Sequence, residues 1–536
     1  MKTKVKETVD KTEGVLSRSG IPLKPVYTPA DLNGWDYKER LGEVGKYPFT
    51  RGMPISPNWE DFAGAGHGSG FGSPESTNKW LKFLISEGAD RVSATFMDLP
   101  TQIGYDSDHP MAEGEVGKAG VSINSLADLE TVFDGIPTDK MVVSSLANAI
   151  GPIFTAWAVN LLKKRGVPLK EMRLGCQNEC LKEIVCRGTQ IFPIREQVKF
   201  NNDVVEYCAR NGLKYATPIT VCGSHFRQAG ATAPQEMAFA LADAVAYYEE
   251  LLGRGLKVDE FAPYVSGIFL GAGMDLFEEI CKLRAFRRMW ARIMREKFGS
   301  KIPPRVHSRG NGRDFTAQQP LNNIIRGTIE LLAVWLGGCP GGETSCYDEA
   351  LAIPTEESVR LAARTRQIIT FESGVLNTAD PLAGSYYVES LTDSLEEKAQ
   401  ELFDKVQSMG GAIIAIEQGF FQSEIARSSY EKVRQIESGE RIWVGVNKYV
   451  TDEPLTINLR KVDAAEERRQ VAKVKRLKKE RDNAAVKVAL KQLKEAARAG
   501  VNVVPVLIDA VKTYATVGEM CDTLRSVWGS YKSMGL

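Results

Sequence analysis

The segments YATPITVCG (residues 215–223) and YVSGIFLG (264–271) are short runs rich in β-branched and aromatic residues. Between them, the stretch 234–252 is predicted to be a helix, because apolar residues recur there at helical spacing: Met237, Phe239, Ala240, Ala244 and Tyr247. A strand, a long helix and a second strand predict a parallel pair joined by a helical crossover. This unit decides the fold class, which is α/β.

The alternation of predicted strands and helices continues on both sides of this unit. Further strands are predicted in the segments 91–97, 141–146, 172–176, 304–310 and 338–346. With the first two they make seven strands, and no segment for an eighth is evident. Alternation of strands and helices over about 250 residues favours a (β/α)8 TIM barrel over an open sheet.

The chain divides into three parts by composition. Residues 1–45 are polar and contain several prolines and glycines, which predicts an extended N-terminal arm. Residues 46–450 carry the barrel pattern, and 451–536 begin with a stretch rich in Ala, Lys, Glu and Arg that predicts a helical C-terminal tail. The basic run 473–481 is flanked by acidic residues, so a solvated helical face or a subunit contact is favoured over a nucleic-acid site.

Charge and hydropathy exclude several classes of function. The 536 residues include 68 Lys and Arg against 68 Asp and Glu, so there is no broad basic field for nucleic acid or an anionic membrane. The longest uncharged stretch, 141–162, is interrupted by polar residues, glycine and proline, and predicts a strand followed by a helix instead of a membrane span. The N-terminal residues have no apolar stretch typical of a secretory signal, so a cytoplasmic location is expected.

The cysteines do not predict a disulfide or metal site. Their odd number, nine, is typical of free thiols in a reducing compartment. Cys176, Cys180 and Cys186 are close in sequence but lack the CxxC pair of most zinc sites, so no metal is expected.

Polar residues at the ends of predicted strands are the first candidates for chemistry, because the active sites of barrels lie at the carboxyl ends of the strands. These residues are Gln177, His225, His307 and Glu343. The glycine-rich stretch GAGHGSGFG (64–72) has no GxGxxG register, so it is interpreted either as a close approach to a ligand or as an ordinary surface turn. Arg187, taken alone, is a helix-capping or surface residue.

Several long segments resemble the large subunit of the adenosylcobalamin-dependent acyl-CoA mutases, the methylmalonyl-CoA mutase family. They include DLPTQIGYDSDHPMAEGEVGKAGVSI (98–123), QNECLKE (177–183), GSHFRQAGAT (223–232), DEFAPYVS (259–266), TAQQPLNNIIR (316–326), YDEALAIPTE (347–356), ESGVLNTADPLAGSYYVE (372–389) and VGVNKY (444–449). So many matches in the same order make coincidence implausible.

The resemblance implies a barrel threaded by the CoA arm, with adenosylcobalamin across one end as the source of a substrate radical. It implies that His225 hydrogen-bonds the thioester carbonyl, with Gln177 assisting in the pocket, since a preorganised donor stabilises charge that shifts during the rearrangement. By the same resemblance Glu349 contacts the adenosyl ribose, Gln318 lies near the corrin, and Arg305 contacts CoA, where guanidinium and phosphate are a natural pair.

The resemblance also gives Arg187 a role, because it aligns with the residue that holds the free carboxylate of malonyl-type substrates. A guanidinium matches a carboxylate bidentately and would be an unpaired charge without one. The expected substrate is therefore a dicarboxylic monothioester of the methylmalonyl-CoA and succinyl-CoA type. The alternatives are a mutase for an uncharged or hydroxylated branched acyl-CoA, of isobutyryl or 2-hydroxyisobutyryl type, and a non-catalytic scaffold subunit.

Three positions depart from the family pattern. Gly68 or a neighbour stands where relatives carry a bulky residue that wedges the substrate, Ser224 replaces a tyrosine, and Glu343 replaces a histidine near the cofactor. Smaller or acidic groups at these positions predict a wider pocket and favour a larger alkylmalonyl or alkylsuccinyl thioester.

The cofactor is expected to be bound together with a separate chain. Relatives that carry their own corrin module use a DxHxxG signature, but the residues two positions before the four histidines are Ala65, Ser107, Gly223 and Arg305. A small cobalamin-binding subunit is thus expected, in a hetero-oligomer that docks through the tail 451–536. A G-protein chaperone is a further partner that the resemblance implies.

Overall fold

The β–α–β unit at 215–271 forms as the sequence predicts. β7 (Ile219–Cys222) and β8 (Val265–Ala272) pair in parallel, with Val221 opposite Ile268. α10 (Ala233–Gly253) crosses between them, and the predicted helix 234–252 is confirmed. The helix starts at Thr232, whose side chain accepts a hydrogen bond from Gln235 N, and a proline stands in its first turn, where no donor is lost.

The parallel strands follow one another in chain order. The computed structural model describes residues 15–53, 70–88, 95–139, 141–339, 342–452, 457–460 and 463–532. One sheet has the order β3 (Thr95–Phe96), β4 (Val143–Leu146), β5 (Arg173–Cys176) and β6 (Tyr215–Thr217), and the other contains β7, β8 and β9 (Val306–Gly310). Only Pro218 separates β6 from β7, and since proline has no N–H to donate, the ladder is interrupted there.

Two irregular segments extend the series of strands. At one end Val121 forms parallel bridges with Met97 and Gly72. At the other end, the backbone N–H of Gly310 donates to the C=O of Glu343 at 2.9 Å. The predicted strand 338–346 is wrong in its described residues, which are turn and irregular backbone in a sequence rich in glycine and proline. The described part of the chain is therefore an α/β fold with parallel strands.

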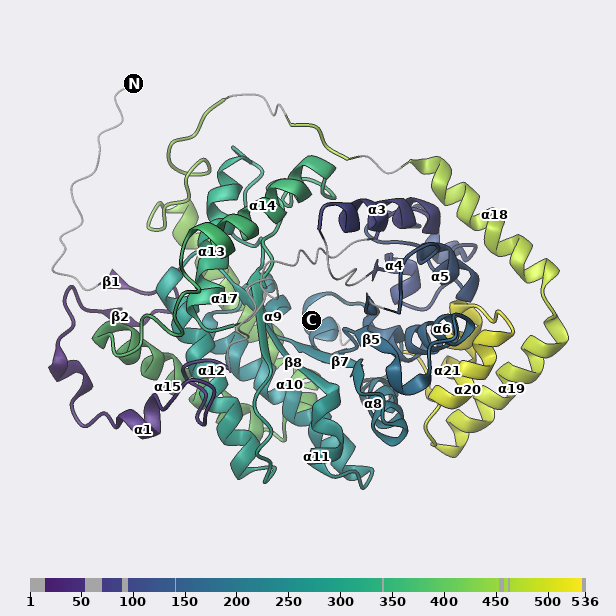
Figure 1. Cartoon of the computed structure of the whole chain (residues 1–536), viewed down its shortest axis with the longest axis horizontal. Coiled ribbons are helices and arrows are strands. Elements are labelled where there is room, and N and C mark those ends of the chain that lie inside the picture. Colours follow the sequence, from purple (N-terminus) through teal and green to yellow (C-terminus); the bar gives the residue numbers. More distant parts are fainter. Residues whose placement is uncertain are drawn as a thin grey trace.

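Helices surround these strands (Figure 1). The most deeply buried are α10 and α6 (Gly151–Lys164), which places large side chains such as Trp157 and Tyr247 in the core. The other helices of residues 70–437 are α3 (Pro74–Ser86), α4 (Leu99–Gln102), α5 (Leu126–Val132), α7 (Leu181–Cys186), α8 (Ile194–Asn211), α9 (Ser224–Ala229), α11 (Val258–Phe261), α12 (Leu276–Glu296), α13 (Asn322–Leu336), α14 (Glu356–Glu372), α15 (Tyr386–Ser408), α16 (Ala412–Glu417) and α17 (Phe420–Glu437).

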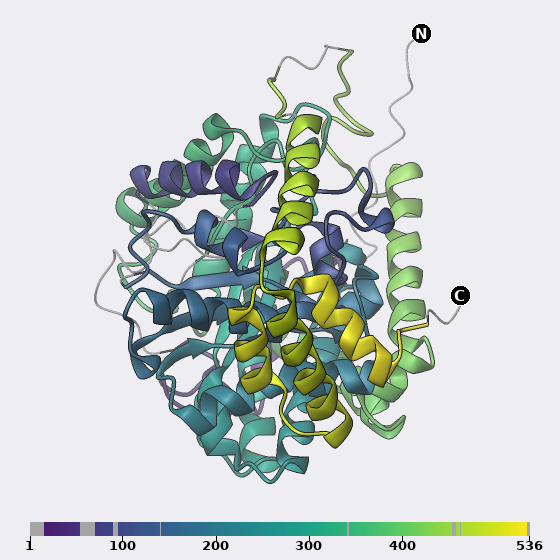
Figure 2. The same cartoon turned by 90° about the vertical axis from the view of Figure 1, so that its right-hand side faces the viewer.

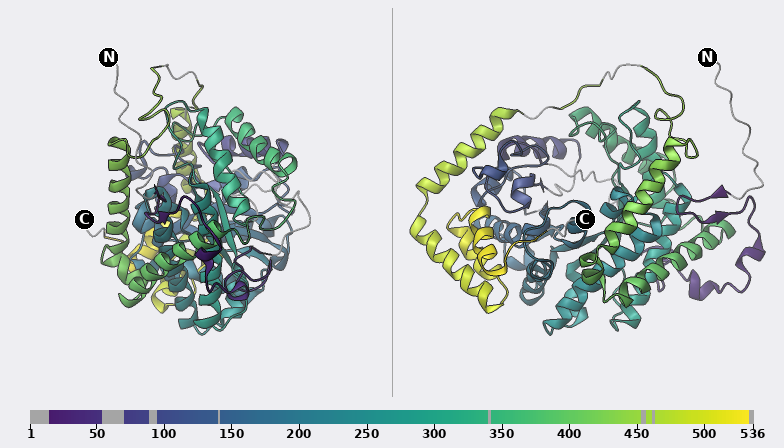
Figure 3. Two further views of the ribbon diagram at one scale, coloured as in Figure 1. Left: turned by 90° about the vertical axis from the view of Figure 1, so that its left-hand side faces the viewer. Right: turned by 180° about the vertical axis from the view of Figure 1, so that it is seen from behind.

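The described part of the N-terminal arm lies against the second half of the fold (Figure 3). It contains the hairpin β1 (Val15–Leu16) and β2 (Pro22–Leu23) and the short helix α1 (Tyr37–Arg40). The hydroxyl of Ser17, between the two strands, donates to Glu278 Oε2 on α12 at 2.6 Å. The arm is thus fixed to the body of the molecule by buried polar contacts.

The tail forms four helices, α18 (Ala464–Glu480), α19 (Asn483–Ala499), α20 (Val504–Lys512) and α21 (Val517–Trp528), which cover the first half of the fold (Figure 2). Asn160 on α6 donates to the C=O of Ile508 at 2.9 Å. The basic run 473–481 also faces the body of the chain, since Lys473 lies 3.0 Å from Asp128 and Lys478 lies 2.9 Å from Asp106. In the described residues we find no helix with the length and apolarity needed to cross a bilayer.

Candidate active site

Two of the predicted site residues, His225 and Gln177, follow the carboxyl ends of their strands. His225 is in the first turn of α9, directly after β7, and its side chain is 7% exposed. Gln177 follows β5, and its backbone is fixed by hydrogen bonds to Ser145 and from Asn148 at 2.9 and 2.8 Å. Its side-chain Nε2 is buried without a hydrogen-bond partner. A buried amide with an unused donor is typical of a ligand-binding position.

The imidazole of His225 is held neutral. Its Nδ1 lies 3.1 Å from Cys222 Sγ, which in turn lies 3.1 Å from Ser224 Oγ. Burial, followed by the positive charges of Lys182, Arg187 and Arg309, lowers the pKa of His225 well below 6.5. Burial also raises the pKa of Cys222, so the thiol keeps its proton. A neutral imidazole with one occupied nitrogen can bind a carbonyl without taking part in proton transfer.

Lys182 is a fully buried cation beside this histidine. Its Nζ lies 2.9 Å from Glu183 Oε1 and donates to Asn148 Oδ1, also at 2.9 Å. Asn148 has a left-handed backbone (φ 45°) and donates its N–H to the C=O of Gln177. Burial raises the pKa of the neighbouring Glu179 to about 7, although Lys182 opposes the shift. The lysine therefore links the position of Gln177 to a buried ionic network.

Arg187 lies at the end of α7, as the sequence predicts, and its side chain remains 39% exposed. Its nearest carboxylate is that of Glu183, with Nη1 and Oε1 separated by 3.7 Å. Glu183 already lies closer to Lys182, so the guanidinium is only partly neutralised. It is also close enough to His225 to affect that side chain's pKa. The geometry leaves Arg187 available to a carboxylate near the imidazole.

Arg309 is a site residue that the sequence analysis missed. It is the fourth residue of β9, its Nη1 lies 4.0 Å from Glu343 Oε2, and its Nε is buried without a hydrogen bond. Its positive charge reaches both His225 and Cys222. The signal was its place at the carboxyl end of a predicted strand. The expectation for His307 is wrong in this respect, because it is the second residue of β9, paired with Phe269 inside the sheet.

The other predicted site residues at the carboxyl ends of the strands lie beside groups other than the imidazole of His225. Ser224 is fully buried and its hydroxyl lies 3.1 Å from Cys222 Sγ, so it packs beside the histidine, and its contact with a substrate stays a prediction. Glu349 and Gln318 are exposed near the loop that follows β9: a Cβ added at Gly312 would come 3.0 Å from Glu349 Cγ, and the Gln318 C=O accepts from Thr316 Oγ1. Gly68 lies outside the described residues.

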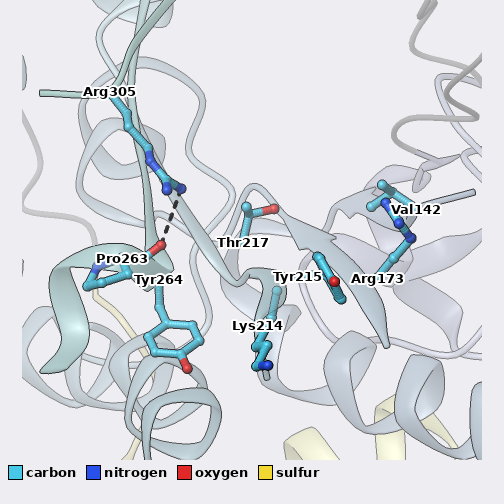
Figure 4. Close-up of a pocket in the computed structure, with 9 residues that line it drawn as sticks. Val142, Arg173, Lys214, Tyr215, Thr217, Pro263, Tyr264 and Arg305 are labelled. Atoms are coloured by element: carbon cyan, nitrogen blue, oxygen red, sulfur yellow. Dashed lines mark hydrogen bonds between the residues drawn. The ribbon is translucent and has the colours of Figure 1, made fainter. Parts of the chain in front are cut away.

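Arg305 lies at the opposite, amino-terminal end of the strands, immediately before β9. Figure 4 shows it at one side of a cavity of about 400 Å³, where its Nη1 donates to the C=O of Pro263 at 3.3 Å. Arg173, which starts β5, and Lys214, which precedes β6, also line this cavity, and none of the described residues that line it is acidic. Neither basic residue was predicted as part of a site, although Arg173 lies within a predicted strand and Lys214 directly precedes one.

Across the described ranges, no three His, Cys, Asp or Glu side chains are grouped so that they could hold a metal ion. The nine cysteines are free thiols, eight of them buried and Cys186 partly exposed.

Comparison with known proteins places these features in a family. The model of the methylmalonyl-CoA mutase family matches residues 16–530. The 2-hydroxyisobutanoyl-CoA mutase large subunit of Aquincola tertiaricarbonis is 39% identical, over 98% of this chain and 94% of that protein. The methylmalonyl-CoA mutases of Rhizobium meliloti and Escherichia coli are each 38% identical, over 96% of this chain and 72% of their own length. The chain therefore belongs to the methylmalonyl-CoA mutase family.

Proposed function

We propose that the chain is the catalytic large subunit of an adenosylcobalamin-dependent mutase that rearranges the carbon skeleton of an acyl-CoA carrying a free carboxylate. The observation that carries this proposal is the neutral His225, which lies among three cations at the carboxyl ends of the strands, the end at which the unpaired amide of Gln177 also lies. A neutral donor in a positive environment suits a thioester carbonyl next to an anionic group.

His225 and Gln177 would hold the thioester oxygen. The Nδ1 atom of the histidine is taken by Cys222, so its Nε2 is the atom left for substrate. The Nε2 atom of Gln177 has no other acceptor. Because the imidazole is neutral and its basicity is low, it can stabilise charge on the carbonyl without removing a proton from the acyl group.

Arg187 would select the free carboxylate. Its guanidinium is partly exposed and has only a shared, 3.7 Å partner. The name of the Aquincola relative keeps the alternative of a hydroxylated, monocarboxylic acyl group open as a second candidate. Arg309 and Glu343, whose side chains approach within 4.0 Å, would then hold the polar group of such a substrate.

The basic cavity at the amino-terminal end of the strands would receive the CoA phosphates. Arg173, Lys214 and Arg305 supply its charge. A strand of five residues such as β9 spans roughly 16 Å at about 3.3 Å per residue, which the extended pantetheine arm can cover. We propose that the strands close into a TIM barrel and that the arm passes along its axis, within residues 46–450.

The cofactor would be held at the other end. The exposed residues Gln318 and Glu349 carry an amide and a carboxyl group that suit the amide and hydroxyl groups of adenosylcobalamin, and the backbone packs closely beside them, since a Cβ added at Gly312 would come 2.7 Å from Ser345 Oγ. When bound, the cofactor supplies the radical that starts the rearrangement. The residues of this chain would hold the thioester, keep its carboxylate in place and shield the reacting carbon from water.

A second chain would complete the enzyme. The Aquincola relative is named a large subunit, and that name implies a partner chain for it. We propose a small cobalamin-binding subunit, assembled with this chain in a hetero-oligomer in the cytoplasm and served by a G-protein chaperone.

The test is a panel of CoA esters given to the full chain together with adenosylcobalamin and a cobalamin-binding subunit that co-purifies with it. The panel contains methylmalonyl-, ethylmalonyl-, isobutyryl- and 2-hydroxyisobutyryl-CoA, and products are separated by mass spectrometry after hydrolysis. Conversion of a malonyl-type ester into its succinyl-type isomer is expected. Conversion of the monocarboxylic esters alone would contradict the proposed substrate, and conversion of none would contradict the proposed activity.

A further inference from the structure

A second group of charged residues lies beyond the carboxyl ends of β8 and β9, around Asp314. Asp314 is 4% exposed, and its Oδ2 accepts the backbone N–H of Met274 at 2.9 Å. Arg18 of the N-terminal arm reaches Oδ2 at 2.9 Å, and Lys432 of α17 reaches Oδ1 at 3.3 Å. Three segments distant in sequence thus meet at one carboxylate.

The cations of this group outnumber the carboxylates that could neutralise them. Arg313 and Arg441 form no ion pair within 4 Å with any described residue. The guanidinium of Arg313 has only a 3.4 Å contact to the C=O of Ala231, which Arg227 already occupies at 2.8 Å. Arg227 itself is balanced, since it lies 2.6 Å from Glu279 and 3.8 Å from Glu278. Asp314 is therefore the main carboxylate facing Arg18, Arg313, Lys432 and Arg441. Glu279 and Glu278, which already lie beside Arg227, act more weakly on Arg313 and Arg441.

The lowered pKa values of Lys432, Arg313 and Arg441 agree with this excess of positive charge. Burial, opposed by Asp314 and reinforced by Arg313 and Arg441, lowers the pKa of Lys432 to about 7. Burial followed by Arg227 lowers the pKa of Arg313 to about 10, and burial followed by Arg18 lowers that of Arg441 to about 10. Cations held together at this energetic cost without matching anions are expected where an external anion binds.

We propose that Arg313, Lys432 and Arg441 form a binding site for an oxyanion, the phosphate or carboxylate group of a ligand that reaches the carboxyl ends of the strands. Two guanidinium groups can each offer paired N–H donors to such an anion, and the ammonium adds a third charge. Asp314 would hold Lys432 and Arg18 in place without filling the site. This oxyanion site is distinct from the Arg187 side chain, which caps a different helix.

The site can be tested on the purified full chain without substrate, cofactor or partner, so the result does not depend on the mutase activity. Sulfate is a suitable probe because its charge is constant near neutral pH. Isothermal titration with sulfate, at an ionic strength kept constant with chloride, should show saturable binding. Arg313→Gln and Arg441→Gln should each weaken this binding at least tenfold. Arg434→Gln is the matched control, because Arg434 is exposed on α17 and paired with Glu431 and Glu440.

Binding should also take up a proton, because Lys432 is half-protonated near pH 7 in the free chain and must be charged beside the anion. Sulfate binding is therefore expected to tighten as the pH falls from 8 to 6. Repeating the titration with acetate distinguishes a phosphate group from a carboxylate group as the natural anion. Tighter binding of sulfate indicates a phosphate group, and tighter binding of acetate indicates a carboxylate. If neither ion binds more tightly than chloride, or if Arg441→Gln binds as wild type does, the proposal is wrong.

Discussion

The thiol of Cys222 lies 3.1 Å from Nδ1 of His225, on the side of the ring away from Nε2. Since burial keeps this thiol protonated, it can donate to Nδ1 while it accepts from the Ser224 hydroxyl. In that arrangement the proton of the neutral imidazole is on Nε2, the atom that the proposed thioester contact requires. We infer that Cys222 and Ser224 set this hydrogen-bonding role of the histidine.

The first prediction concerns this tautomer. In ¹⁵N NMR spectra of the full chain, His225 should show the Nε2–H form, and Cys222→Ser should retain it because a hydroxyl can donate in place of the thiol. Cys222→Ala should shift the population toward the Nδ1–H form. Cys208→Ala, a change at another buried thiol, should leave the His225 signals unchanged. An Nδ1–H form in the wild type would contradict this arrangement.

The second prediction is the pH dependence of stability. The pKa of His225 is lower in the folded chain than in the unfolded chain, so at acidic pH the unfolded state binds more protons. The histidine therefore lowers the free energy of unfolding as the pH falls below about 6.5, by at most about 1.4 kcal/mol per pH unit. Urea unfolding between pH 7.5 and 5 should show a smaller loss in His225→Gln than in wild type. An equal loss in the two proteins would mean that the pKa of His225 is the same in the folded and unfolded chains and would contradict the lowered pKa.

The third prediction concerns substrate choice. Arg187→Gln should lower kcat/KM for a carboxylated acyl-CoA by about 10- to 150-fold, since a hydrogen bond to a charged group contributes about 1.5–3 kcal/mol. For a monocarboxylic thioester such as isobutyryl-CoA, the change should be less than threefold. Arg195→Gln, at another exposed position, serves as the control. A uniform loss for both substrates would assign Arg187 a structural role.

The fourth prediction concerns the CoA end of the molecule. Arg305→Ala and Lys214→Ala should raise KM for CoA thioesters while leaving kcat within about twofold, because both lie at the opposite strand ends from His225. The same variants should leave the KM for a truncated N-acetylcysteamine thioester unchanged, because this substrate lacks the nucleotide phosphates. An equal effect on the truncated substrate would place these residues near the reacting group.

The fifth prediction concerns the buried network. Lys182→Met removes the cation that Glu183 contacts at 2.9 Å and leaves buried carboxylates without a partner. Removing one partner of a buried ion pair costs about 3–5 kcal/mol, and chemical unfolding should show a loss of this size. The double variant Lys182→Met with Glu183→Gln should recover part of it. A loss below about 1 kcal/mol would mean that the network does not support the site.

The sequence predicted the fold where local periodicity was strong. The strand ends at Gln177 and His225 and the helix 234–252 could be recognised because alternating runs and helical spacing are local properties. The segment at Val121 could not, since it joins the strands through isolated bridges, with too short a run for a pattern. The strand at 338–346 was predicted wrongly because its described residues are turn and irregular backbone in a sequence rich in glycine, joined to β9 by the hydrogen bond from Gly310 to Glu343.

The candidate site was predicted for residues within recognisable motifs. Arg309 and Lys182 were missed because their role depends on which side chains the fold brings next to His225. The charge excess around Asp314 was also beyond sequence analysis, since Arg18, Lys432 and Arg441 are far apart in the chain.

The most direct test of the proposed thioester site is the carbonyl signal of a bound substrate. Succinyl-CoA labelled with ¹³C at the thioester carbon is bound to the full chain, and its chemical shift is compared with that of the free ester. A downfield shift on binding is expected in wild type and in His109→Ala, and it should be lost in His225→Ala while the ester still binds. An unchanged shift in His225→Ala would contradict the central claim that this histidine holds the thioester.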